Sequence, residues 1–505
     1  MAQIILRLTR IFALVFLLSM PTLTQAMSSP RLAQDAGNAE SVEAEPRVKN
    51  VLFIISDDLK ASALGCYGNA VCNTPNLDAL ARRGMLFERA YCNATWCAPS
   101  RQSLMFSRYL GTGNIGGEGV GSGPAGAHQP NLGQHFRENG FYSARVGKIY
   151  HMRVPGDIIA GTNGNDVRDS WTERFNSPGP EAHTPGDYAC LNKNIFTRDL
   201  ANRQSTRTRH RMFVTVKIDG KGTGQADYKS ASKAIELLNQ HKDDPFFLAV
   251  GLVRPHYPMV APRSLFDSYS WKDLALPRVV KDDLHDIPKL GLGQTLSSKN
   301  QIGKFPDNQK RMWAGYYASV TFMDQQVGRI IAELDRLGLS ESTAIVFTSD
   351  HGYHLGEHSF WQKSNLHEEV ARVPLIIATP SGAATRSRSF VELVDLFPTM
   401  ADWVGLKIPA TVRGRSLVPI LKDANASVRD SALVQHQGHL LRTDGWAYMR
   451  YQDETEELYD MKLDPNQFSN LAFEGLANQN QDRLIKMRAA LKAKLKALGI
   501  KPGSN

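Results

Sequence analysis

The stretch VLFIISDD, residues 51–58, indicates the fold, because an unbroken apolar run stops abruptly at a serine and two aspartates. A strand that is apolar at every position buries both of its faces, which is typical of a parallel sheet covered by helices on both sides. Such sheets bind their ligands beyond the carboxyl ends of the strands. Asp57 and Asp58 are therefore predicted to lie at the edge of a binding site.

Three further stretches repeat this pattern. Residues 140–146 run into Lys148 and His151, residues 246–252 into Arg254 and His256, and residues 344–347 into Asp350 and His351. Between the strands lie helical patterns such as residues 319–337, which stop at a glycine. The sequence predicts an α/β fold with a large, mixed, mostly parallel sheet sandwiched by helices, and it predicts that the polar residues after four strands converge on one site.

The rest of the chain differs in texture. Residues 155–224 are rich in Gly, Asn, Asp and Arg, which predicts long loops over the rim of the site with a short structured piece around 212–218. After residue 430, a hairpin at 441–451, a strand at 457–460 and a basic amphipathic helix near the end predict a smaller antiparallel-sheet-plus-helix subdomain. We expect a catalytic domain at 47–430 and the subdomain at 431–505.

The first 46 residues resemble a leader and a spacer. Arg7 and Arg10 precede a short apolar run at 11–18, and small residues ending at Ala26 offer a cleavage site. Residues 1–26 are predicted to be a signal peptide and residues 27–46 a polar spacer, so the protein is expected to be exported. The apolar run is too short to span a membrane.

Charge and cysteine content limit the function classes. The formal net charge is +9, but no basic stripe with interleaved aromatics occurs, which argues against nucleic acid as a partner. The five cysteines are an odd number, so in an oxidising compartment at least one is unpaired or chemically altered. If Cys97 is set aside, the other four permit three pairings, and the sequence does not choose among them.

The carboxylates at the strand ends suggest a metal site. Asp57, Asp58 and Asp350 offer hard oxygen ligands, which suit Ca²⁺ or Mg²⁺. Adjacent buried carboxylates repel each other and need a cation to offset their charge. We therefore expect a divalent cation where the first and the last of these strands end.

Four basic side chains are candidates for binding an anion and moving protons. They are Lys148, His151, His256 and Lys363. A histidine titrates near neutral pH, and a lysine donates to anionic oxygens without needing a bidentate fit. Beside a dication these residues are expected to form an anion clamp and a general acid–base pair.

The stretch Cys97-Ala98-Pro99-Ser100-Arg101 supplies a candidate nucleophile. Proline is favoured at the first position of a helix, so a helix beginning at Pro99 would put Arg101 one turn from Cys97. Cys97 would then lie at a positively polarised helix start, where a nucleophile that meets an anion is expected.

These five residues match the sulfatase signature C-x-P-S-R, and residues 140–151 resemble the second sulfatase signature. SDD at 56–58, TSDHG at 348–352 and ELYDMKLDPNQFSNL at 457–471 extend the resemblance over nearly all of the mature chain. SDDLKASALGCYGN, the spacing in GKIYH and FFLAVGLVRPHYP are most similar to the iduronate-2-sulfatase branch of the family.

The resemblance implies an alkaline-phosphatase-like fold and a modified cysteine. In sulfatases the signature cysteine is oxidised to formylglycine before folding by a formylglycine-generating enzyme, which would be a partner during maturation. The implied Ca²⁺ ligands are Asp57, Asp58, Asp350, His351 and the modified Cys97. The family often has Asn or Gln at the position of His351.

The implied reaction is hydrolysis of a sulfate ester by a hydrated aldehyde at residue 97. A hydroxyl of that group attacks sulfur, and His256 and Lys363 help to protonate the departing alcohol. His151 then removes a proton from the second hydroxyl, which expels sulfate and restores the aldehyde. A serine has no second hydroxyl with which to do this.

The same resemblance suggests how substrate is held. Arg101 and Lys148 are expected to bind the diol and sulfate oxygens, with His256 and Lys363 beside them, and Arg254 is a candidate contact for a sugar carboxylate. The expected partner is a sulfated carbohydrate such as a sulfated uronate in a polysaccharide. An exported enzyme of this kind would be periplasmic or extracellular, or lysosomal in an animal.

Two alternatives stay open on sequence alone. One is a phosphate or phosphonate monoester hydrolase of the same superfamily, with Cys97 unmodified. The other is a non-catalytic glycan-binding protein that has kept the fold.

Overall fold

The computed structural model describes residues 48–111, 130–203, 210–293 and 295–500. The predicted signal peptide and spacer, residues 1–46, lie outside this part of the chain. All of the described residues belong to one compact unit. Among the described residues, no helix is both long enough and apolar enough to cross a bilayer.

The main sheet contains nine strands within the described residues. They are β1 (Asn50–Asp57), β2 (Met85–Tyr91), β3 (Tyr142–Gly147), β4 (Glu173–Phe175), β8 (Phe246–Pro255), β10 (Thr343–Ser349), β13 (Arg372–Val373), β14 (Leu375–Ala378) and β15 (Thr385–Glu392). Their order is β13-β2-β14-β10-β1-β8-β3-β4, with β15 beside β2. Strands β10, β1, β8, β3 and β4 are parallel, whereas β14 is antiparallel to β10. The predicted mixed, mostly parallel sheet is confirmed.

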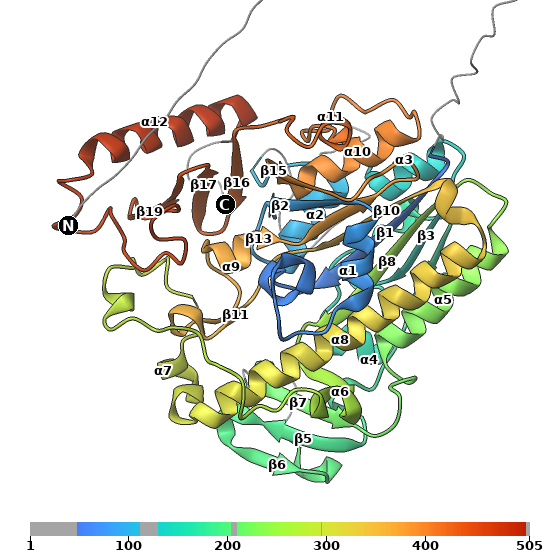
Figure 1. Cartoon of the computed structure of the whole chain (residues 1–505), viewed down its shortest axis with the longest axis horizontal. Coiled ribbons are helices and arrows are strands. Elements are labelled where there is room, and N and C mark those ends of the chain that lie inside the picture. The colour runs from blue at the N-terminus through green and yellow to red at the C-terminus, as the bar shows by residue number, and fades with distance from the viewer. Residues whose placement is uncertain (1–47, 112–129, 204–209, 294, 501–505) are drawn as a thin grey trace, which may run out of the picture. The chain divides into compact units, whose positions relative to one another are not determined.

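Helices cover both faces of this sheet (Figure 1). Along β1, Leu52 and Ile54 point into one core, and Val51, Phe53 and Ile55 point into the other. The first core is completed by α1 (Pro75–Arg82), α5 (Ala226–Gln240) and α8 (Pro306–Arg336), and the second by α2 (Cys97–Phe106), α3 (Leu132–Glu138) and α10 (Leu396–Trp403). A strand buried on both faces explains why residues 51–55 are apolar at every position.

The C-terminal part forms a separate antiparallel sheet. It contains β16 (Ser431–Gln435), β17 (Gly438–Thr443), β18 (Trp446–Tyr451) and β19 (Glu456–Asp460), followed by α12 (Gln481–Leu498). Leu433 and Leu441 pack against α12, whereas Val434 and Leu440 face the core of the main sheet. The predicted hairpin, strand and basic helix are confirmed, and the sheet is joined to the main sheet by a shared core.

The prediction of loops over residues 155–224 was wrong in part. The segment contains α4 (Gly156–Ala160), β4, β5 (Gly186–Cys190), β6 (Ile195–Thr197) and β7 (Val214–Ile218). Strands β6, β5 and β7 join β9 (Met259–Pro262) in a second small sheet. The strands are three to five residues long and pair with distant partners, so local sequence gives little sign of them. Only β7 matches the structured piece expected around 212–218.

Two helix boundaries also differ from prediction. Helix α8 begins at Pro306, well before residue 319, with proline at its start, and it ends just before Gly338, whose φ is +70°. Helix α2 begins at Cys97, and the amide of Ser100 donates to the carbonyl of Trp96 over 3.0 Å. Pro99 is therefore the third helical residue, where its missing N–H costs no helical hydrogen bond.

The remaining α-helices and strands are short. They are α6 (Arg263–Asp267), α7 (Ser297–Asn300), α9 (Glu368–Ala371), α11 (Val418–Lys422), β11 (His354–Leu355) and β12 (Trp361–Gln362). All five cysteines are free thiols in the structure, and Cys66 is the one of them that is only partly buried.

Candidate active site

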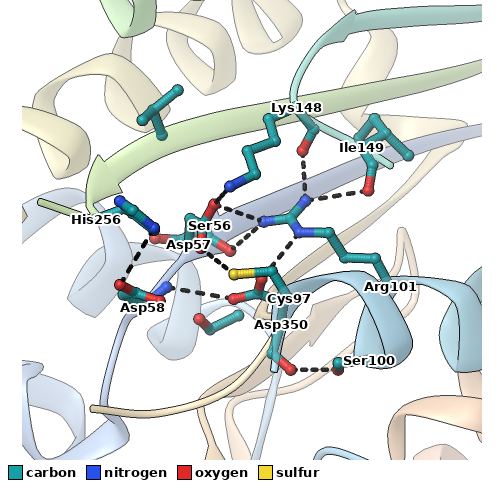
Figure 2. A network of polar contacts seen from close by, with 12 residues as sticks. Ser56, Asp57, Asp58, Cys97, Ser100, Arg101, Lys148, Ile149, His256 and Asp350 are labelled. Carbon is teal, nitrogen blue, oxygen red and sulfur yellow. Dashed lines mark hydrogen bonds and ion pairs between the residues drawn. The ribbon is translucent and has the colours of Figure 1, made fainter. Parts of the chain in front are cut away.

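Many of the predicted site residues lie together at the carboxyl edge of the main sheet, and Figure 2 shows Asp57, Asp58, Cys97, Arg101, Lys148, His256 and Asp350 there. Strand β1 ends at Asp57, β3 is followed by Lys148, β8 by His256, and β10 by Asp350. Parallel pairing of β10, β1, β8 and β3 places these four ends along one edge. The structure thus brings the polar residues that follow these four strands to one edge of the sheet, where the sequence predicted them.

Asp57 is fully buried among cations. Its carboxylate pairs with the Lys148 ammonium and lies 3.4 Å from Arg101 Nη2. Burial disfavours the charge, yet Lys148 and Arg101 hold the pKa of Asp57 well below its usual range. Asp57 is therefore ionised at neutral pH.

The charge of Asp58 is less well balanced by cations than the charge of Asp57. It adopts a positive φ of 61°, pairs with Lys363, and lies with Oδ1 3.5 Å from His351 Nε2 and Oδ2 3.7 Å from His256 Nε2. Burial raises the pKa of Asp58 to about 8, although Lys363 opposes this shift. Asp58 Oδ2 is buried and accepts no hydrogen bond from the described residues.

Asp350 and His351 complete the acidic cluster from β10. Asp350 pairs with Arg101 Nε at 2.9 Å and accepts from the amide of Asp58 at 3.3 Å. The Nδ1 of His351 lies 2.9 Å from the Gly352 carbonyl, which can only accept, so Nδ1 carries a proton. Nε2 consequently faces the cluster, 3.3 Å from Cys97 Sγ. Burial disfavours the charged imidazole, yet Asp350 raises the pKa of His351 to about 9.

Cys97 places its sulfur at the centre of this cluster. It is the first residue of α2, and its side chain is buried. The Sγ atom lies 3.4 Å from Asp57 Oδ1 and 3.0 Å from Lys363 Nζ. The start of the helix contributes a positive partial charge at this point. A negative charge beside residue 97 would therefore be stabilised.

The cluster has the composition of a divalent-cation site. One ligand atom each from Asp57, Cys97, Asp350 and His351 lies within 4.8 Å of all the others, and Asp57, Asp58, Cys97 and His256 form an overlapping group. The carboxylates offer hard oxygens, and the unpartnered Oδ2 of Asp58 points to a missing partner. These residues fit a cation such as Ca²⁺.

Arg101 fastens the strand ends to one another. Its guanidinium is buried and donates to the carbonyls of Ser56, Lys148 and Ile149 in addition to pairing with Asp57 and Asp350. Ser100 Oγ donates to the Asp350 carbonyl. Within the described residues, these contacts of Arg101 are all with protein groups, and they join the ends of several strands.

His151 and His256 are neutral in this environment. Burial and Lys363 lower the pKa of His256 well below its usual value, and its Nδ1 lies 2.7 Å from the Tyr257 carbonyl. Burial and Lys148 lower the pKa of His151 to about 3, and its Nδ1 is buried without a hydrogen bond from the described residues. Both imidazoles are therefore uncharged at neutral pH, and each has one ring nitrogen without a proton.

Arg254 differs from the expectation that it binds a sugar carboxylate. Its guanidinium is buried, pairs with Glu181 Oε2 at 2.6 Å and donates to the His256 carbonyl at 2.8 Å. Asp227 accepts from the amides of Val253 and Arg254. These contacts fix the turn that carries His256. Sequence analysis missed Glu181, because it lies in an irregular stretch with no motif.

Lys363 lies in a loop with a strained backbone. Its neighbours Gln362 and Ser364 have φ values of 74° and 77°, in the left-handed region that non-glycine residues rarely adopt. Burial lowers the tendency of Lys363 to stay charged, yet Asp58 and Cys97 raise its pKa well above the usual value. A second lysine, Lys60, pairs with Glu357 and Glu369 and ties the same loop to the end of β1.

Replacing Lys60 with methionine is expected to destabilise the protein by about 3 kcal/mol, because two partly buried carboxylates lose their counter-ion. Urea unfolding measures this change. Burial raises the pKa of Glu357, but Lys60 lowers it further, so the pKa in the folded protein lies below its usual value. The stability difference between the wild type and Lys60→Met should therefore shrink as the pH falls below about 4. The matched control is Arg83→Met in the exposed Arg83–Asp335 pair, where a change under about 1 kcal/mol is expected. Equal losses in both variants would contradict the bracing role.

The fold and the site together define a hydrolase of the alkaline-phosphatase-like fold. A family model described as Sulfatase matches residues 49–406, and a model described as N-sulphoglucosamine sulphohydrolase, C-terminal, matches residues 356–498. The chain belongs to the sulfatase family of sulfuric ester hydrolases.

Individual relatives agree with this assignment. The chain is 30% identical over 457 residues to a sulfatase of Formosa agariphila, covering 86% of this chain and 85% of that protein. It is 32% identical over 399 residues to the iduronate 2-sulfatase of Homo sapiens, covering 71% and 70%.

Solved structures share the fold. A protein in complex with its substrate D-glucosamine-2-N,6-O-disulfate has a TM-score of 0.68 at 20% identity, with 91% of this chain and 100% of that chain covered. The phosphonate monoester hydrolase of Silicibacter pomeroyi has a TM-score of 0.71 at 23% identity, with 90% and 96% covered. At this identity the likeness concerns the fold alone.

Proposed function

We propose that this protein is an exported sulfatase that hydrolyses sulfate esters of a sulfated polysaccharide or oligosaccharide. Residue 97 acts as a formylglycine nucleophile beside one Ca²⁺ held by Asp57, Asp58, Asp350, His351 and residue 97 itself. The observation that supports this most directly is the position of Cys97, at a helix start and within 3.5 Å of Asp57, His351 and Lys363.

The cation and the modified residue supply what the unmodified chain lacks. Ca²⁺ would neutralise the carboxylates and polarise an anionic oxygen at residue 97. Formylglycine, when hydrated, would offer two hydroxyl groups, one to attack sulfur and one whose deprotonation releases sulfate. Because this release needs no attack of water on a crowded anionic sulfur, the modification explains why a thiol occupies this place in the sequence.

The chain's own side chains orient the ester and move protons. Lys148 pairs with Asp57 and Lys363 with Asp58, and both ammonium groups donate to sulfate oxygens. The departing alcohol takes a proton with the help of Lys363, which stays charged and can donate, and of His256 beside it, and His151 takes a proton from residue 97. The neutral imidazole of His151 suits proton acceptance, and the buried setting strengthens each charged hydrogen bond.

The proposed substrate is a sulfated uronic acid or a related sugar, by similarity to iduronate 2-sulfatase. Arg254 is bound to Glu181, so recognition of the sugar carboxylate would fall to other groups on the rim of the site. Maturation would require a formylglycine-generating enzyme, and the leader at residues 1–26 would direct the chain to the periplasm, the extracellular space or, in an animal, the lysosome.

Two measurements on the naturally matured protein test this function. Mass spectrometry of the peptide containing residue 97 should show an aldehyde in place of a thiol. Sulfate release from 2-O-sulfated uronate disaccharides should exceed, by at least about a hundredfold in kcat/KM, the hydrolysis of matched phosphate and phosphonate esters. A free thiol with faster phosphonate hydrolysis would support the phosphonate hydrolase alternative. Glycan binding without sulfate release by modified protein would support the non-catalytic one.

A further inference from the structure

A second cavity lies between the small sheet and helices α6 and α8. Its volume is about 350 Å³, and it shares no residue with the candidate active site. Figure 1 shows the small sheet beside α6 and the first half of α8. The lining includes Phe196, Lys217, Trp271 and Arg311.

The register of the small sheet places small side chains in the middle of this cavity and an aromatic side chain at its edge. Ala189 pairs with Thr215 on one side and with Phe196 on the other, so these side chains share one face. On α8, Ala314 lines the same space. Small residues in the middle with an aromatic ring at the edge leave room for a flat ring-shaped ligand.

Arg311 is positioned between two aromatic rings. Its guanidinium carbon lies 3.8 Å from the centre of the Trp271 ring and 5.5 Å from that of Phe196, whose side chain is 52% exposed. The Nε atom is buried and makes no hydrogen bond with the described residues. Burial lowers the pKa of Arg311, and Asp307, one helical turn earlier, opposes this shift. Among the described residues, Arg311 is thus a cation that contacts aromatic rings and pairs with no carboxylate.

The residues that line the cavity include three cations and one carboxylate. Of these, Arg198 and Asp187 belong to an ion-pair network with Arg263 and Asp219. Lys217 has one exposed carboxylate contact, to Asp267 at 3.5 Å, and its ammonium lies 5.6 Å from the Phe266 ring. Lys217 and Arg311 therefore remain available to an anion that enters beside the aromatic rings.

We propose that this cavity is a second, non-catalytic binding site for one anionic sugar unit of a longer saccharide chain. Trp271 and Phe196 would pack against the apolar face of the sugar ring, while Arg311 and Lys217 bind its sulfate or carboxylate. The choice of a saccharide rests on the proposed function. This second site would hold the saccharide chain while the active site hydrolyses another sugar unit of the same chain. Binding there would raise the effective concentration of substrate at the active site.

The test is binding of a heparin octasaccharide to the full chain carrying Cys97→Ala, which prevents turnover. Arg311→Met in this background should lower the affinity measured by calorimetry at least about tenfold, and Lys217→Gln should lower it less. A desulfated, N-acetylated octasaccharide separates the two anions: loss of binding assigns sulfate, and retained binding assigns the carboxylate. The matched control is Arg483→Met, because Arg483 lies 4.3 Å from the Trp446 ring outside the cavity and carries the same charge.

Activity gives an independent readout. In the catalytically intact protein, Arg311→Met should leave kcat/KM for a sulfated disaccharide unchanged and lower it for the octasaccharide. Octasaccharide binding that is unaffected by Arg311→Met, or reduced equally by Arg483→Met, would overturn the proposal. Lack of disaccharide hydrolysis by the wild type would instead contradict the proposed function, so the two failures are distinguishable.

Discussion

Replacing Cys97 with serine is expected to lower steady-state sulfate release by at least about 10⁴-fold while leaving the fold in place. Serine keeps one hydroxyl at the start of α2, within reach of Lys363 and His351, so the first attack on sulfur remains possible. It lacks the second hydroxyl that would expel sulfate, so the variant should accumulate as a sulfate ester. Intact mass after incubation with substrate would show one added SO₃ group per chain.

The matched control for this experiment is Cys66→Ser. Cys66 is a partly buried thiol beside Asp78, and none of its observed contacts involves the site residues. Normal turnover is expected there. Normal turnover by Cys97→Ser would mean that one hydroxyl suffices and would rule out the need for formylglycine. Lack of both turnover and the sulfate adduct would place the nucleophile elsewhere.

The main sheet could be predicted because its strands are apolar at every position and end at polar residues. Leu52 and Phe53 face opposite cores, so neither face of β1 tolerates a polar side chain, and the pattern is visible locally. The small sheet has no such pattern. Its strand β5 contains Gly186 and Asp187, and the pairing of β7 with β5 and β9 depends on contacts distant in sequence.

The candidate site also contains residues that the sequence predicted and contacts that it did not. Cys97, Asp57 and Asp350 were predictable because each belongs to a motif or ends a recognisable strand. The Glu181–Arg254 pair was not, because its two members lie 73 residues apart and Glu181 belongs to no motif. Arg254 was consequently predicted to meet the substrate, whereas its buried pairing makes it a support for the turn before His256. Long-range ion pairs are properties of the folded chain, and a single sequence does not display them.

The second large effect concerns the metal site, where Asp350→Asn is expected to lower Ca²⁺ affinity by at least about a hundredfold and sulfate release by about 10³-fold. The substitution keeps the shape of the side chain but removes one of three carboxylates. Ca²⁺ at a thousand times its Kd should stabilise the wild type by about 4 kcal/mol, seen as a rise in Tm after removal of metal with EGTA. The variant should show no such rise at the same Ca²⁺ concentration.

Asp324→Asn separates this effect from a simple loss of stability. Asp324 is also buried, but it accepts from the amides of Asn76 and Leu77 at the start of α1, away from the candidate site. Its loss should lower Tm without changing the rise caused by Ca²⁺. An Asp350→Asn protein that responds to Ca²⁺ like the wild type would show that the three carboxylates are balanced by Arg101, Lys148 and Lys363 alone. The cluster would then be an ion-pair network and would not hold a metal.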